Sequence, residues 1–404
     1  IATRIGCSVQ NDMSCLRIQD AKRLVNVFGY SPPGIGVQIA TVEGENQRVG
    51  PALLSYKAVH TQLRNPHLKR HPLFALGVNI ARLPPGVVPE DIQPTLFQLN
   101  TDDPQRMMRL VTMSEIFSQL GSHPTRIKFV GAPPHPVNVS RAAGSDVRQI
   151  VNLVAVNLFR VIFQVDITSF LDQMYTFSIV MAQVSVGAHP TPKQVGIMNT
   201  TRTAVELFVR EVSREANLYA KTMTQKGEDG DMRLREVIFY TLTIGLSSIC
   251  ALVRSTMLYI MKKPKEHAKR FRVDNEKFVL EAARLFPPVD GANPYVVGAD
   301  SLYTLANGRR FKEREGDTGL MYIATANRDP AVFGEDSEAF DENRPNLEQL
   351  LTFTDRLEAI RQCEVFGKCN ESPRGCPGTY LSLYLTAKSV NYFVEAYPVD
   401  KDEL

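Results

Sequence analysis

Apolar residues recur with helical spacing over several long parts of the chain. The stretches that predict helices are 56–68, 146–171, 200–224 and about 232–261, and a Gly/Pro/His-rich segment at 186–193 links the second to the third. The fourth stretch is apolar on nearly all sides, so we expect its helix to cross the middle of the fold. Gly245 lies within it, where glycine costs about 1 kcal/mol relative to alanine. Either another group approaches the backbone closely there, or the helix is loosely packed.

Shorter runs of residues that favour extended backbone predict strands towards both ends of the chain. The strand-like runs are 36–42, 303–305, 310–312 and 320–325, with turn signals at Asn307-Gly308 and Gly316. The first hundred residues also contain Pro/Gly clusters, so we expect an irregular part with a small sheet there.

Two pairs of charged residues lie three apart on predicted helices. Arg106 and Arg109 follow Pro104, which favours a helix start. They are either cations on a solvated face or a clamp for an anion. Glu281 and Arg284 share one face of a second helix, where the simplest interpretation is a surface ion pair.

Cys376 immediately precedes a predicted apolar helix. Pro377 and Gly378 suit a tight bend or a helix start. A thiolate at a helix start meets unpaired N–H groups and the positive end of the helix dipole, which predicts a lowered pKa, and Arg374 adds positive charge. Cys376 is therefore a candidate anionic ligand; the alternative is a small buried apolar cysteine.

Composition and charge exclude several classes of protein. The net charge is +3 and no basic run is interleaved with aromatic residues, so we expect no nucleic-acid partner. The longest uncharged run, 237–253, contains hydroxyl side chains and predicts a buried helix rather than a transmembrane span. The six cysteines show no zinc spacing with the seven histidines. The sequence Lys401-Asp-Glu-Leu404 matches the signal for retention in the endoplasmic reticulum, so we expect a lumenal location.

The order of these motifs resembles that of the cytochrome P450 superfamily. The motifs are Arg106 and Arg109 after Asp103-Pro104-Gln105, Glu281-x-x-Arg284, Asn327-Arg-Asp-Pro with Phe333, Arg344, and Arg374-Gly-Cys376-Pro-Gly378. Glu-x-x-Arg alone occurs in many proteins, but the ordered set is specific. The resemblance covers most of the chain after residue 100.

The resemblance implies a fold and a cofactor. The expected fold is mainly α, of the α+β kind, with a large helical lobe and a small β-rich lobe. We expect one domain over 1–404, irregular at 1–100 and helical at 100–404.

The implied cofactor is haem b, with Cys376 as the ligand of the haem iron and Cys369 as a rival ligand. The residues that the resemblance assigns to haem binding are Cys376, Arg374, Arg109, Arg106, Gln105 and Gly378. Glu281, Arg284 and Arg344 would form a structural ion network that positions the cysteine loop.

Two features depart from the family pattern. The oxygen-activating helix of the family carries an acid followed by Thr, whereas the matching residues here, Ile244-Gly-Leu-Ser-Ser248, contain no acid. Ser247 and Ser248 could relay protons only weakly. Cys369 also replaces the usual Phe seven residues before the ligand. Altered loops at this point resemble those of family members that use a peroxide or a hydroperoxide directly.

The resemblance therefore predicts a haem-thiolate enzyme that does not need a redox partner. It is expected either to act on a fatty-acid hydroperoxide, as a hydroperoxide isomerase or lyase, or to use peroxide to oxidise a lipid-like substrate. The residues expected on the distal side of the haem are Thr243, Gly245, Ser247 and Ser248. A conventional monooxygenase that uses O2 and a reductase is one alternative. A non-catalytic binding or assembly protein is another.

Overall fold

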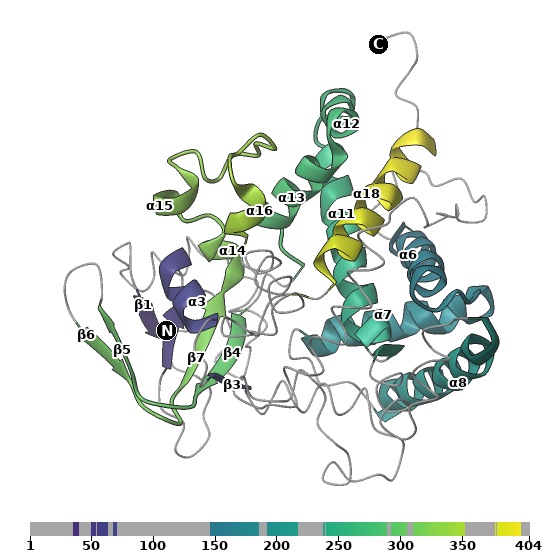
Figure 1. Ribbon diagram of the computed structural model, residues 1–404, viewed down its shortest axis with the longest axis horizontal. Helices are drawn as coiled ribbons and strands as arrows, with labels where there is room; N and C mark the ends of the chain where they lie inside the picture. The colour runs from purple at the N-terminus through teal and green to yellow at the C-terminus, as the bar shows by residue number, and fades with distance from the viewer. Residues whose placement is uncertain are drawn as a thin grey trace.

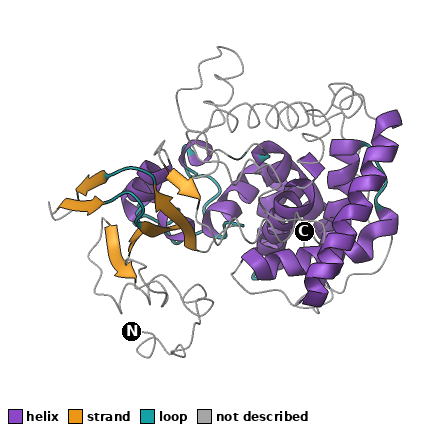
Figure 2. Ribbon diagram, turned by 90° about the horizontal axis from the view of Figure 1, so that it is seen from below, coloured by secondary structure: helices purple, strands orange, loops and turns teal. Residues whose placement is uncertain are grey.

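The computed structural model describes twelve parts of the chain, and all structural statements concern these parts. They are residues 35–39, 50–53, 55–63, 68–70, 146–185, 192–216, 237–238, 240–288, 292–304, 310–351, 376 and 378–396. Figure 1 shows the strands gathered on one side of the molecule and the long helices on the other. Figure 2 shows the same separation from below. The predicted helical lobe and smaller β-rich lobe are both present.

The long helices pack around one central helix. They are α6 (Asp146–Phe163), α7 (Leu171–Ser185), α8 (Pro192–Ala216), α11 (Leu246–Ile260), α12 (Pro264–Val273), α13 (Asn275–Leu285) and α18 (Thr379–Ala396). A π-helical turn, η6 (Thr241–Gly245), leads directly into α11. Helix α11 packs against α6, α13 and α18, and α13 also packs against α18. The buried apolar residues of α11 belong to the main core, which confirms that α11 crosses the middle of the helical lobe.

Short elements and strands complete the fold. The short helices are α3 (Tyr56–Leu63), η5 (Thr168–Phe170), α14 (Ile323–Ala326), α15 (Pro330–Phe333) and α16 (Leu347–Leu350). The strands are β1 (Ile35–Ile39), β2 (Gly50–Leu53), β3 (Leu68–Arg70), β4 (Ala292–Val297), β5 (Ser301–Thr304), β6 (Arg310–Glu313) and β7 (Thr318–Tyr322).

The larger sheet joins strands from distant parts of the sequence. Its order is β1-β2-β7-β4-β3, and among the described strands only the β2–β7 pair is parallel, with Ala52 opposite Leu320. Strands β5 and β6 form a separate antiparallel pair. Gly316, in the turn between β6 and β7, has a φ of 84°, which an L side chain rarely adopts, so the predicted turn is confirmed.

The structure corrects three of the predicted helix boundaries. The helix predicted at 56–68 ends at Leu63, and Leu68 instead begins strand β3, where it pairs with Val297 of β4. The helix predicted at 146–171 ends at Phe163, because Gln164 takes a left-handed conformation with a φ of 58°. Asp166 Oδ1 then accepts the N–H of Thr168 at 2.9 Å, and α7 begins at Leu171. Helix α8 begins at Pro192, inside the predicted linker, because proline is well suited to the first turn of a helix.

One predicted strand is shorter than its apolar run. The strand predicted at 320–325 ends at Tyr322, the last residue of β7, and Ile323 begins α14. Within the described residues, no helix combines the length and apolar character of a membrane span.

Candidate functional site

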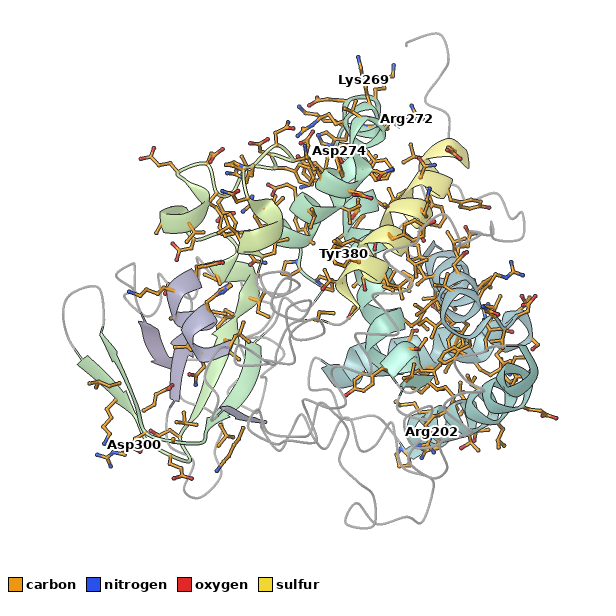
Figure 3. All side chains as sticks on the ribbon, viewed as in Figure 1. Arg202, Lys269, Arg272, Asp274, Asp300 and Tyr380 are labelled. Carbon is orange, nitrogen blue, oxygen red and sulfur yellow. The ribbon has the colours of Figure 1, made fainter. Side chains whose placement is uncertain are left out.

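Cys376 lies in the turn that begins α18. The backbone N–H and the hydroxyl of Thr379 donate to the Cys376 carbonyl oxygen at 3.3 and 2.9 Å. One turn further on, Ser382 N–H donates to Gly378 O at 2.8 Å. Leu381 and Leu385 are buried in the main core and hold this end of the helix in place. The label of Tyr380 marks the start of α18 in Figure 3.

The surroundings of the Cys376 thiol act on its pKa in opposite directions. Burial raises the pKa, whereas hydrogen bonds from the Gly378 backbone and the Thr379 side chain lower it. The pKa is raised overall, so the expectation of a lowered pKa is wrong for the protein alone. The helix start supplies the expected donors, but desolvation outweighs them. A positive charge close to the sulfur would shift the balance towards the thiolate.

Glu281 and Arg284 form a fully buried ion pair on α13. Arg284 Nε donates to Glu281 Oε2 and Arg284 Nη2 donates to Glu281 Oε1, both at 2.7 Å. Both side chains are 0% exposed, so the interpretation as a surface ion pair is excluded. Such a bidentate pair has a fixed geometry.

Arg284 also ties α13 to the segment that follows the large sheet. Its Nη1 donates to Asn327 O at 2.8 Å and to Ser337 O at 2.6 Å, and its Nη2 donates to Ala339 O at 2.9 Å. Every one of these bonds spans more than forty residues of sequence. The guanidinium therefore cross-links two distant segments, and it lies 5.1 Å from the centre of the Phe333 ring.

Arg344 joins this pair, as the resemblance implies. Its Nε donates to Glu281 Oε1 at 3.3 Å, and its Nη1 donates to Phe333 O at 2.7 Å and to Asp336 Oδ1 at 2.9 Å. The hydrogen bond from Arg344 lowers the pKa of Asp336. The structure thus brings Glu281, Arg284 and Arg344 into one network.

Asp329 links this region to the β-rich lobe. Its Oδ1 accepts the N–H of Ala331 at the start of α15, and its Oδ2 accepts the N–H of Tyr56 at the start of α3, at 3.0 and 2.9 Å. The Tyr56 ring also meets Phe333 edge to face, with 5.9 Å between the ring centres. The Asp329-Pro330 dipeptide predicts the hydrogen bond to the N–H of Ala331, which caps the start of α15. The hydrogen bond to the N–H of Tyr56 forms only in the tertiary structure.

Sequence reasoning missed a second ion network beside the first. Arg270 on α12 binds Glu342 through two hydrogen bonds, one of them between Nε and Oε1 at 2.8 Å. The Arg270 guanidinium lies 5.6 Å from the Phe340 ring centre, and Phe340 stacks on Tyr259. The hydrogen bond with Arg270 lowers the pKa of Glu342. No local spacing relates the two charges, so the sequence carries no signal for this pair.

The residues predicted for the distal side lie at the start of α11. A β-carbon on Gly245 would lie 3.3 Å from the Tyr240 carbonyl oxygen and 3.7 Å from Leu158 Cδ2, which favours close packing, the first of the two interpretations of this glycine, over loose packing. Ser247 and Ser248 are half-buried. Thr243 lies within η6, and π turns inside helices are frequent at functional sites.

Packing between helices brings the two candidate regions into one part of the molecule. Helix α18, which follows Cys376, packs against α11, which follows Gly245. Helix α13, with Glu281 and Arg284, contacts both. Gln105, Arg106, Arg109, Cys369, Arg374 and the terminal Lys401–Leu404 signal lie outside the described residues, so their roles stay predictions.

Solved structures resemble this fold, although no family model matches the sequence and no curated protein does. The mixed-function P450 MycG shares 17% identity, over 95% of this chain and 90% of that chain, with a TM-score of 0.62. The methyl hydroxylase MycCI from Micromonospora griseorubida, bound to mycinamicin VIII, shares 15% over 94% and 89%, with a TM-score of 0.61. The P450 monooxygenase TamI shares 14% over 99% and 90%, with a TM-score of 0.59.

Proposed function

Because the chain has the cytochrome P450 fold, we propose that it is a haem-thiolate oxidoreductase in which Cys376 is the protein ligand of the iron. The observation that carries the proposal is the position of the Cys376 thiol in the turn that begins α18, where the backbone of Gly378 lowers its pKa against the effect of burial. A helix start of this kind suits a sulfur that bears negative charge. Burial opposes that charge, and a haem iron held by Cys376 would supply the positive charge that offsets it. The site therefore fits haem.

The buried network holds the segments around the ligand. Arg284 fixes α13 to residues 327–339, and α13 packs against α18. We assign Glu281, Arg284 and Arg344 a positioning role, because all three engage other protein groups. Arg374, Arg106, Arg109 and Gln105 are assigned to the haem propionates by resemblance alone.

A peroxide is the oxidant that the distal helix favours. When bound, haem supplies the redox chemistry that cleaves an O–O bond. The sequence from Val237 to Val253 contains no carboxylic acid, and Ser247 and Ser248 are weak proton donors. A hydroperoxide brings its own O–O bond and two-electron oxidising power, so it needs neither a reductase nor proton delivery to O2. The proposed reaction reduces a hydroperoxide, such as that of a fatty acid, to an alcohol and inserts the other oxygen into a lipid-like substrate.

Monooxygenation with O2 and a reductase is the second candidate. Two of the similar solved structures are named a methyl hydroxylase and a P450 monooxygenase, and these names favour monooxygenation over peroxide use. Under it, Ser247 or Ser248 would relay protons from solvent. The non-catalytic alternative predicts protein without a thiolate-bound haem.

Spectroscopy and oxidant choice test these proposals in turn. The haem-loaded protein should show the carbon monoxide difference band of a thiolate-bound haem, and Cys376→Ser should lose it. Cys250→Ser is the matched control, because Cys250 is the other described free cysteine and burial raises its pKa strongly. An unchanged band in Cys376→Ser would exclude this ligand.

Turnover of a fatty acid with cumene hydroperoxide, but without NADPH, would support peroxide use. Turnover only with NADPH, O2 and a reductase would select the second candidate. The lumenal location stays a separate prediction.

A further inference from the structure

We propose that the outer face of α12 binds an anionic lipid surface. The basic stripe is defined as Lys265, Lys269 and Arg272 on α12 together with Lys262 in the turn before it, and all four residues are exposed. Figure 3 shows Lys269 and Arg272 at the outer edge of the molecule, pointing away from the helical lobe. The inference does not depend on haem or on the identity of the oxidant.

The stripe concentrates positive charge. Residues 262–272 contain six Lys or Arg and one Glu, and Arg270 is paired with Glu342, so the local charge is +4, whereas the whole chain carries +3. The single acid, Glu266, lies 3.1 Å from Lys263, which is outside the stripe. The side chains of Lys269 and Arg272 are exposed and make no hydrogen bond or ion pair with other described residues. Their charges therefore face solvent.

The opposite face of α12 fixes the orientation of the stripe. His267, Ala268 and Phe271 are buried, and His267 Nδ1 lies 2.9 Å from the Tyr259 carbonyl oxygen, a contact between this face of α12 and the end of α11. His267 also stacks on Tyr259, with 4.5 Å between the ring centres. Because its apolar face is already used in the core, α12 can lie against a membrane surface but cannot insert as an amphipathic helix does.

An exposed apolar side chain at the end of the stripe favours lipid over an acidic protein. Val273 is 81% exposed, the most exposed of the large hydrophobic residues in the described part of the chain. It directly follows Arg272. A row of exposed cationic side chains that ends in an apolar one suits the fluid surface of a bilayer, where headgroups rearrange around each charge. A protein partner would need a matching hollow of fixed shape.

Vesicle co-sedimentation of the full haem-loaded chain tests the proposal. We expect binding to phosphatidylcholine vesicles that contain about 30% phosphatidylserine, at about 0.15 M salt, and none to pure phosphatidylcholine. Each Lys or Arg at an anionic surface contributes about fivefold in affinity. The double variant Lys269→Gln/Arg272→Gln should therefore bind about 25-fold more weakly, and Val273→Ser should bind a few-fold more weakly.

A matched control separates the stripe from net charge. Lys57→Gln/Lys193→Gln removes two exposed cations from α3 and α8 and should bind as the unmodified chain does. Equal losses in the two double variants would overturn the proposal, as would absence of binding at about 0.15 M salt. Poly-L-glutamate is the protein-like probe: if it binds through the stripe and anionic vesicles do not, the site is one for acidic proteins. Thermal unfolding should show that all variants remain folded.

Discussion

Two ion networks of this protein differ in how completely they exclude water. Glu281 and Arg284 are both 0% exposed, whereas the side chains of Arg270 and Glu342 are 30% and 11% exposed. In the first network, each charge depends wholly on its protein partners, because no water can replace them. In the second, water can reach the guanidinium. Similar bidentate geometry should therefore have very different energetic consequences.

The largest effect should come from breaking the buried pair. Glu281→Gln leaves the Arg284 guanidinium buried without its counter-charge, so we expect a loss of about 3–5 kcal/mol in the free energy of unfolding. Chemical denaturation measures this loss. Glu276→Gln, an exposed change on the same helix, should cost less than about 1 kcal/mol. Equal costs for the two variants would contradict the distinction between buried and solvated carboxylates.

The half-buried pair should be less costly to break. Arg270→Met keeps much of the apolar stem but removes the guanidinium, and water can then solvate part of Glu342. We expect a loss of about 1–2 kcal/mol, measured by the same denaturation. Lys269→Met, one residue earlier and exposed, should change stability by no more than about 0.5 kcal/mol. A cost for Arg270→Met as large as that for Glu281→Gln would remove the contrast between the networks.

Asn327 combines a hydrogen-bonded polar group and an unbonded one in a single residue of the first network. The Asn327 carbonyl accepts Arg284, but its buried side-chain amide has no hydrogen-bond partner among the described residues. Asn327→Leu should therefore change the free energy of unfolding by less than about 1 kcal/mol, since it removes a desolvated polar group. A loss above about 2 kcal/mol would instead reveal an internal water bound to the amide.

Asn157→Leu is the matched control for this variant. The Asn157 amide is also buried and donates to Leu153 O at 2.8 Å. This change should cost about 1 kcal/mol, because it removes a hydrogen bond that is made.

The smallest expected effect is a pH dependence of the second network. The Glu342 pKa is lowered in the folded protein, mainly by the hydrogen bond with Arg270. Its contribution to stability is therefore present above the unfolded pKa of about 4.3 and is lost as the pH falls through the lower folded value. The stability difference between the unmodified chain and Glu342→Gln should be constant near neutral pH and shrink below about pH 4. A difference that grows with acidity would have the wrong sign.

Local patterns were sufficient for the elements and for part of the site. Residues three apart on a helix are neighbours in any fold, so Glu281 and Arg284 could be paired from spacing alone. Apolar spacing likewise indicated the helices around Gly245 and after Cys376. The raised pKa of the Cys376 thiol could not be foreseen, because desolvation depends on what the rest of the fold places around the sulfur.

The sequence by itself determined which segments are helical and which residue types stand ready at their ends. Only tertiary structure decided that Arg344 meets Glu281, that Arg270 meets Glu342, and that strands near residue 50 pair with those near 320. The physical reason is the range of the interactions. Backbone geometry fixes contacts within one or two helical turns, whereas contacts between distant segments form only when the whole core buries its apolar surface.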